Sequence, residues 1–109
     1  MAAPKNERRS QDRIPVEIPV SIRSSQGEST AGLTRDLSMT GIFLYTDGQI
    51  LEGSELEMVL MLPPQFTNGE KQWVCCQASV VRVEASGEQG KIGVAANIRT
   101  IASLPEIPI

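Results

Sequence analysis

The clearest structural pattern in the chain is Val16-Glu17-Ile18-Pro19-Val20-Ser21-Ile22-Arg23, in which apolar and polar side chains alternate. Successive side chains of a β-strand point to opposite faces, so this alternation is typical of a strand with one buried face. Pro19 has no backbone N–H to donate, which indicates an edge strand or a bulge at this point. We therefore predict a half-buried strand over residues 16–23.

Five further segments have strand-like patterns between turn signals. We predict strands at about Ser29 to Asp36, Ile42 to Thr46, Gly53 to Leu62, Gln72 to Glu84 and Ile92 to Ile98. In the second strand we expect Ala31 and Leu33 to face inward. In the long fifth strand the inward set changes after Val80 to Val81 and Val83, which indicates a bulge.

No segment has a sustained helical period, and six short strands predict an all-β protein, a six-stranded antiparallel β-barrel. Closing the sheet also removes exposed strand edges. Residues 1–13 are polar, with no apolar anchor before Ile14, and are expected to form a flexible N-terminal arm. We expect the barrel to span residues 14–100 and a short C-terminal tail to span residues 101–109.

Composition narrows the possible functions. The chain has 109 residues and a formal net charge of −3, which favours one domain and argues against binding of a nucleic acid polymer. It has no long apolar run and no apolar segment of a secretory signal near its start, so we expect a cytoplasmic protein without membrane insertion. Four positive residues within the first thirteen nevertheless make the arm locally cationic, which suits a small anionic ligand.

Catalysis and metal binding have no support in the sequence. Histidine is absent, so the usual proton shuttle at neutral pH and the commonest metal ligand are missing. Cys75 and Cys76 are adjacent and would point to opposite faces of a strand, so we expect two reduced thiols. We predict a protein that is not an enzyme, with no catalytic residue, no metal site and no cofactor.

Two arginines of the arm, Arg9 and Arg13, are the first candidate ligand-binding residues. Their spacing of four places both side chains on one side of the backbone, whether it is helical or extended. An arginine can donate two hydrogen bonds to guanine O6 and N7, pair with phosphate and stack on a base. The alternative interpretation is a solvated basic tail.

The second candidate is the sequence Asp36-x-Ser38-x-x-Gly41 at a connection between strands. Aspartate can accept hydrogen bonds from guanine N1 and N2, and serine offers a hydroxyl to a phosphate or a base. Gly41 permits either a close backbone approach or a positive φ. The alternative interpretation is a turn that caps itself with its own side chains.

Taken together, the two motifs resemble those of the PilZ domain family, bacterial receptors for cyclic di-GMP. The family signature is Arg-x-x-x-Arg before the first strand, followed about two dozen residues later by Asp/Asn-x-Ser-x-x-Gly. These motifs stand here at residues 9–13 and 36–41, and the resemblance covers roughly residues 7–100. The family fold is a six-stranded antiparallel barrel, which agrees with the period-two pattern.

The resemblance implies a cyclic di-GMP site built from Arg8, Arg9, Arg13, Asp36, Ser38 and Gly41. The arginines of the first motif would hold guanine and phosphate groups. The aspartate and serine of the second would read guanine and complete the pocket, and the glycine would shape the turn. An arginine at the position of Arg8 goes in this family with binding of two stacked ligand molecules; the alternative is that Arg8 is a solvated neighbour.

The function that follows is a receptor or adaptor whose arm becomes ordered on ligand binding and thereby regulates an unidentified protein partner. Two alternatives remain. One is a degenerate PilZ-like module that binds only proteins. The other is an oligonucleotide-binding barrel, which four aromatic residues and a negative net charge disfavour. For Phe43, Tyr45 and Trp73 we expect packing roles.

Overall fold

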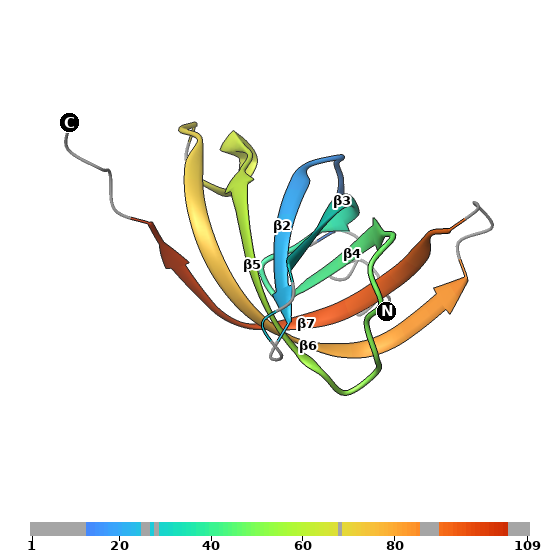
Figure 1. The fold of residues 1–109 in the computed structure, drawn as a ribbon. Helices are drawn as coiled ribbons and strands as arrows, with labels where there is room; N and C mark the ends of the chain where they lie inside the picture. Colours follow the sequence, from blue (N-terminus) through green and yellow to red (C-terminus); the bar gives the residue numbers. More distant parts are fainter. Residues whose placement is uncertain (1–12, 25–26, 28, 68, 86–89, 105–109) are drawn as a thin grey trace, which may run out of the picture.

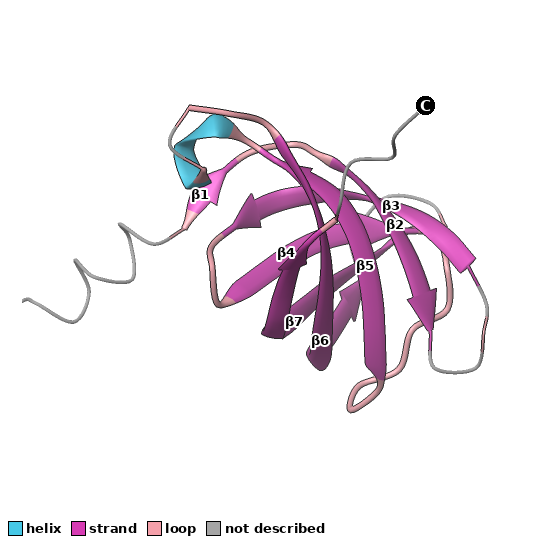
Figure 2. Ribbon diagram, turned by 90° about the vertical axis from the view of Figure 1, so that its left-hand side faces the viewer, coloured by secondary structure: helices cyan, strands magenta, loops and turns pink. Residues whose placement is uncertain are grey.

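A computed structural model describes residues 13–24, 27, 29–67, 69–85 and 90–104. It contains seven strands: β1 (Ile14–Pro15), β2 (Pro19–Ser24), β3 (Ser29–Leu37), β4 (Gly41–Thr46), β5 (Glu55–Leu62), β6 (Gln72–Ala85) and β7 (Ile92–Ser103). Within these ranges the only helical segment is a single 3-10 turn, η1 (Pro64–Phe66), drawn in cyan in Figure 2. No helix in this part of the chain is long and apolar enough to cross a bilayer.

The strands close into a barrel. Six of them follow the order β3-β2-β5-β6-β7-β4, and a further pairing between β3 and β4 joins the two ends. Every neighbouring pair is antiparallel. The curved β6–β7 pair forms one long side of the barrel in Figure 1. The predicted six-stranded antiparallel barrel is thus confirmed, with the short β1 added against β3.

The core fills the inside of this barrel. Its members come from alternate positions of each strand, as in Leu56, Met58, Leu60 and Leu62 of β5, which are all buried while their neighbours face outward. The register of the β2–β5 pair places buried residues of the two strands side by side, since Ile22 of β2 lies opposite Met58 of β5. Full burial of such a side chain contributes about 1.5–3 kcal/mol, so these buried rows are a major source of stability for the barrel.

The inward face of β3 differs from the prediction. Ala31 and Leu33 point outward, and Leu33 is 41% exposed. Thr34 is buried instead. An added Cβ at Gly32 would lie only 3.1 Å from the Ile22 side chain. The expectation that Ala31 and Leu33 face inward was wrong because the space inside β3 is already filled by side chains of its neighbours, which leaves room only for small residues.

The irregularity expected near Pro19 lies between β1 and β2. Ile14 pairs with Leu37, and Pro19 pairs with Leu33. The step from Ile14 to Pro19 is five residues, whereas the step between their partners is four, so one residue is extra on this side. Pro19 itself is the first residue of β2, a position where a missing N–H costs nothing.

The Thr34 side chain makes hydrogen bonds to the backbone at the irregularity between β1 and β2. Its hydroxyl accepts a hydrogen bond from the Ile18 backbone N at 2.8 Å and donates to the carbonyl oxygen of Val16. Thr34 is only 1% exposed, and a buried polar group of this kind must be satisfied. The Thr34 side chain therefore supplies an acceptor to Ile18 N and a donor to the carbonyl oxygen of Val16 at the irregularity.

The predicted bulge in β6 is confirmed. The register with β7 shifts between Val80 and Arg82, which makes Val81 the extra residue. Val81 is 50% exposed, so its expected inward position was wrong, while Val83 packs against the core. A bulge moves every later side chain to the other face, which explains why the inward set changes at this point.

The last strand is longer than expected. β7 continues to Ser103, so residues 101–103, which were predicted to belong to the tail, are strand. They pair with the first half of β6, where Cys75 lies opposite Ala102. β4 pairs only with residues Ile92 to Asn97 of β7, and the second half of β7 therefore extends beyond it. The register with β6 skips Arg99, since Ala78 pairs with Ile98 and Gln77 pairs with Thr100. This irregularity breaks the alternation of the strand after Ile98 and concealed the extension.

Candidate ligand-binding site

The short strand β1 places Arg13 beside the end of β3. Pro15 lies opposite Asp36 in the β1–β3 pair, and Arg13 stands two residues before Pro15. The Arg13 Nε donates to Asp36 Oδ1 at 3.0 Å, and its Nη2 lies 2.7 Å from the same oxygen. The structure therefore brings together Arg13 of the first motif and Asp36 of the second. Arg8 and Arg9 lie outside the described residues.

A second arginine holds the other oxygen of the same carboxylate. Arg35 Nε lies 2.7 Å from Asp36 Oδ2. This hydrogen bond is the main reason that the pKa of Arg35 is raised. The Asp36 side chain is 14% exposed, against 39% for Arg13 and 50% for Arg35. Two guanidiniums around one carboxylate leave a local net positive charge, which suits an anionic ligand.

A β-bulge explains how two consecutive residues meet in this way. Neighbours in a regular strand point to opposite faces. In β3, however, Thr34 pairs with Leu44 and Asp36 pairs with Phe43, so the register shifts and Arg35 is the extra residue. Thr34 is buried inside, whereas Arg35 and Asp36 both face outward. The bulge thus creates a pair of adjacent charged side chains on one face.

An aromatic layer lies beneath Arg35 on the outer face. The Arg35 guanidinium stands 3.9 Å from the centroid of the Phe43 ring, a cation–π geometry. Tyr45 meets the same ring edge-on with centroids 5.5 Å apart. Phe43 is 2% exposed, and its ring crosses Gly93, where an added Cβ would lie 2.7 Å from Phe43 Cζ. The ring and the guanidinium therefore fix each other.

Arg35 was not among the site residues predicted from the sequence. A regular strand through Asp36 would have placed Arg35 on the opposite face from the motif aspartate. The signal that could have revealed it is the short apolar sequence Ile42-Phe43-Leu44-Tyr45, in which both faces of β4 are apolar. The packing role expected for Phe43 is confirmed by its burial, although it packs outside the barrel core.

Ser38 belongs to the tight turn between β3 and β4. Its backbone N donates to the carbonyl oxygen of Gly41 at 2.8 Å. Its Oγ accepts from the backbone N of Thr40 at 3.2 Å and of Gly41 at 3.0 Å. The carbonyl of Thr40 in turn accepts from the Ile98 N at 2.9 Å, which ties the turn to β7. Ser38 is 3% exposed, so the self-capped turn considered for this sequence is present.

Gly41 is required for close approach and not for a positive φ. Its φ is not positive, unlike that of four other described glycines. An added Cβ at this position would lie 3.2 Å from Arg13 Nη1 and 3.6 Å from the carbonyl oxygen of Ala96. The absent side chain therefore leaves the space in which the Arg13 guanidinium lies.

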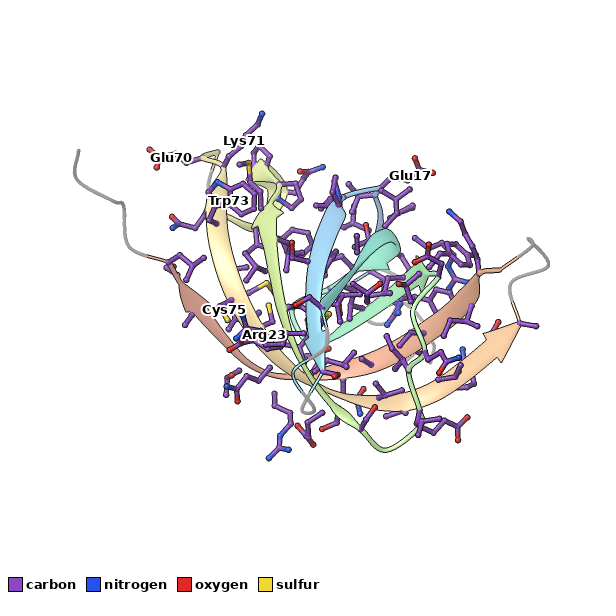
Figure 3. The ribbon with its side chains drawn as sticks, viewed as in Figure 1. Glu17, Arg23, Glu70, Lys71, Trp73 and Cys75 are labelled. Atoms are coloured by element: carbon purple, nitrogen blue, oxygen red, sulfur yellow. The ribbon has the colours of Figure 1, made fainter. Side chains whose placement is uncertain are left out.

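Other candidate groups lie elsewhere. Trp73 is 50% exposed near the start of β6, beside Glu70 and Lys71 (Figure 3), so the packing role expected for it was wrong. Cys75 and Cys76 are free thiols. Burial raises the pKa of Cys76 to about 11, which keeps this thiol protonated and unreactive at neutral pH.

Two surface depressions of about 370 and 390 Å³ lie beside β2 and β5, and both are lined by Arg23 and Glu57. None of the described motif residues lines either of them. Within the described ranges, no group of three or more histidine, cysteine, aspartate or glutamate side chains is placed to hold a metal ion. The charged site around Asp36 lies apart from both depressions, and the exposure of its side chains ranges from 14% for Asp36 to 50% for Arg35.

These observations define the chain as a closed β-barrel domain that gathers arginine, aspartate and a Ser-Gly turn on its outer face. Residues 7–103 match the model of the PilZ domain. The chain therefore belongs to the PilZ domain family, a family of cyclic di-GMP receptors.

Solved structures agree in fold. The Bacillus subtilis inhibitor of motility (MotI/DgrA) matches with a TM-score of 0.67 and 22% identity, over 84% of this chain and 42% of that one. The PilZ domain of CeSA from a cellulose-synthesizing bacterium matches with a TM-score of 0.52 and 22% identity, over 81% and 80%. This chain thus spans less than half of the motility inhibitor. No curated protein matches the sequence.

Proposed function

We propose that this protein is a cyclic di-GMP receptor or adaptor, in which ligand binding changes the N-terminal arm and thereby regulates a protein partner. The observation that carries the proposal is the contact between Arg13 and Asp36, at 2.7 Å, because it brings one residue of each motif into contact. Family membership over residues 7–103 supports the choice of ligand.

The ion pair suggests how the ligand would bind. Guanine presents two donors, N1 and N2, to the Asp36 carboxylate, while Arg13 can donate to guanine O6 and N7 or to phosphate. The ligand would therefore take the place of Arg13 on Asp36 Oδ1 and offer Arg13 new acceptors. Asp36 would regain donors from guanine and Arg13 would regain acceptors on the ligand, so this exchange of partners costs little.

The turn would complete the site. Both acceptor positions of Ser38 Oγ are used by backbone N–H groups, which leaves its hydroxyl hydrogen to donate. The acceptors now within reach of that hydrogen are distant, at 3.3 Å for the carbonyl oxygen of Gly41 and 3.4 Å for the Thr40 hydroxyl. A phosphate or base oxygen is a stronger acceptor if it approaches across Gly41, where no side chain intervenes. Ser38 is then both a turn residue and a ligand donor.

The arm carries the rest of the proposal. Arg9 would hold guanine and phosphate groups together with Arg13, and Arg8 would favour a stacked pair of ligand molecules. A ligand that bridges the arm to the barrel orders a segment, which is a recognised form of switching. The protein partner would read this ordered surface. The similarity to an inhibitor of motility and to the PilZ domain of CeSA from a cellulose-synthesizing bacterium makes the machinery of motility and of cellulose synthesis the first to test.

Calorimetric titration with cyclic di-GMP tests the ligand. We expect binding by the wild type and its loss in Arg13→Ala and Asp36→Ala. Arg99→Ala is the matched control, because Arg99 is also an exposed arginine paired with one carboxylate, Glu55, at 3.0 Å. No heat with the folded wild type, or unchanged binding in both site variants, would contradict the proposal and favour the module that binds only proteins.

The same titration gives the number of ligands. Two molecules per chain, reduced to one in Arg8→Ala, would support the stacked pair. Amide hydrogen exchange tests the switch, since exchange over residues 8–13 should slow on saturation with the ligand. Unchanged exchange at saturation would contradict the conformational part of the proposal and leave the binding part intact.

A further inference from the structure

We propose that Arg35 is a positioning and specificity-determining residue, which fixes the Asp36 carboxylate so that it reads the hydrogen-bond donors of guanine. This inference rests on the proposed function, since it concerns the same ligand. It adds a residue outside both sequence motifs. It is based on the position of Arg35 between the Asp36 carboxylate and the Phe43 ring.

Two contacts from different strands fix Arg35. Its Nε binds Asp36 Oδ2 at 2.7 Å, and its guanidinium lies 3.9 Å above the ring of Phe43 in β4. The ring is itself buried, 2% exposed. The planar guanidinium thus has one edge on the carboxylate and one face on the ring, an arrangement that lysine does not reproduce.

The two arginines on Asp36 are anchored differently. Arg13 precedes β1, a strand of two residues that pairs with β3 alone. Arg35 belongs to β3, a strand of nine residues that pairs on both sides. A ligand that displaces Arg13 from Oδ1 would therefore leave Arg35 on Oδ2. The carboxylate keeps a cationic partner and a fixed plane while its other oxygen becomes available.

The free acceptor positions fit guanine. Each carboxylate oxygen has two lone pairs. Once Arg13 moves, Oδ1 is open, and Oδ2 keeps a second lone pair beside Arg35. Guanine N1 and N2 can then donate to the two oxygens side by side. Adenine has an acceptor at N1 and hypoxanthine lacks the N2 amine, so a fixed carboxylate plane discriminates against both bases.

Selectivity is the readout that separates positioning from a structural role. Calorimetry would compare cyclic di-GMP with cyclic di-IMP, whose bases lack the 2-amino group, on the wild type, Arg35→Ala, Arg35→Lys and Phe43→Leu. We expect Arg35→Ala to lose about tenfold or more in affinity for cyclic di-GMP, since it removes a hydrogen bond to a charged group. The loss for cyclic di-IMP should be smaller, so the ratio of the two affinities falls.

Two further variants separate the charge of Arg35 from its contact with the Phe43 ring. Arg35→Lys retains the charge and should restore part of the affinity, whereas Phe43→Leu removes the ring face and should lower the selectivity ratio with Arg35 still present. Arg99→Ala should leave both affinities and their ratio unchanged. Circular dichroism and urea unfolding of each variant show whether it is folded.

The two-ligand titration has four outcomes, and each either supports or overturns the proposed role of Arg35. If the wild type binds cyclic di-GMP and Arg35→Ala keeps its affinity and selectivity, the role of Arg35 is overturned and the receptor function stands. An equal loss for both ligands also overturns it, because the effect is then general. If the folded wild type binds neither ligand, the receptor function fails and this inference fails with it. A lower ratio in Arg35→Ala and Phe43→Leu, with partial rescue by lysine, supports it.

Discussion

Substitution of Gly93 tests the aromatic layer of Phe43 and Tyr45 beneath Arg35, because Gly93 is not itself one of the proposed ligand-binding residues. An alanine Cβ at this position would lie 2.7 Å from Phe43 Cζ and 3.0 Å from Phe43 Cε1. Ordinary contact begins at 3.4 Å, so Gly93→Ala requires the ring to move by about 0.7 Å. The ring has Arg35 on one face and forms a T-shaped pair with Tyr45, so a movement of the ring disturbs the guanidinium.

The expected cost follows from overpacking, which typically destabilises a protein by about 1–3 kcal/mol. Urea unfolding measures it, because a small protein loses about 1–3 kcal/mol of stability per molar urea. A cost near ~2 kcal/mol would therefore lower the urea midpoint by about 1 M. The displaced Arg35 should also weaken cyclic di-GMP binding in the same direction as Arg35→Ala.

A double-mutant cycle identifies the cause. Phe43→Leu removes the tip of the ring, and in that background Gly93→Ala should cost nothing or stabilise slightly. Alanine is favoured over glycine within a strand by about 0.5–1 kcal/mol when there is space for it. The same destabilisation in both backgrounds would refute the argument that the Phe43 ring occupies the space above Gly93.

Three further predictions concern other parts of the barrel. Thr34→Val should destabilise the protein by about 1–3 kcal/mol in urea unfolding, because it leaves the buried Ile18 N–H without an acceptor; a neutral substitution would contradict the bridging role of Thr34. Burial raises the pKa of Cys76 from 9.0 to about 11, so this thiol supports folding fully below pH 9 and less as the pH rises through about 11. Unfolding of the wild type and Cys76→Ala from pH 8 to 11 would test this, and parallel curves would exclude it. Trp73, the only tryptophan, should be quenched by acrylamide in the folded state, and Trp73→Ser should change stability by less than about 0.5 kcal/mol; a protected fluorescence would show that it is covered.

The strands could be predicted from the sequence where one face of the strand is buried and the other is exposed to solvent. β2 and β5 alternate regularly, so the period of two locates both strands and their inward rows. The pattern failed in β3, because Gly32 and Thr34 face inward and Leu33 faces outward. At these inward positions Gly32 is required for its small size and Thr34 for its hydrogen bonds to a backbone irregularity. A pattern of hydrophobic residues indicates neither requirement.

The site could be predicted only as two motifs. Arg13 and Asp36 are far apart in sequence, and their contact depends on the antiparallel pairing of β1 with β3. The similarity of both motifs to those of one family is what predicted that they form a single site. The roles of the individual residues in binding remain predictions, and Arg8 and Arg9 lie outside the described residues.

Arg35 shows why the remaining part of the site could not be read from the chain. In a regular strand the side chains of Arg35 and Asp36 would point to opposite faces of the sheet. The sequence pattern therefore indicates only a solvated arginine at this position. One extra residue in the β3–β4 register places both on the outer face, and the ring of Phe43 then fixes the guanidinium. The bulge leaves no signature within β3 itself, and the signal for it lies in the apolar sequence Ile42-Phe43-Leu44-Tyr45 of the neighbouring β4. Under the proposed function, the bulge matters because it creates this pair of neighbours, since Arg35 would hold the Asp36 carboxylate in place when the ligand displaces Arg13.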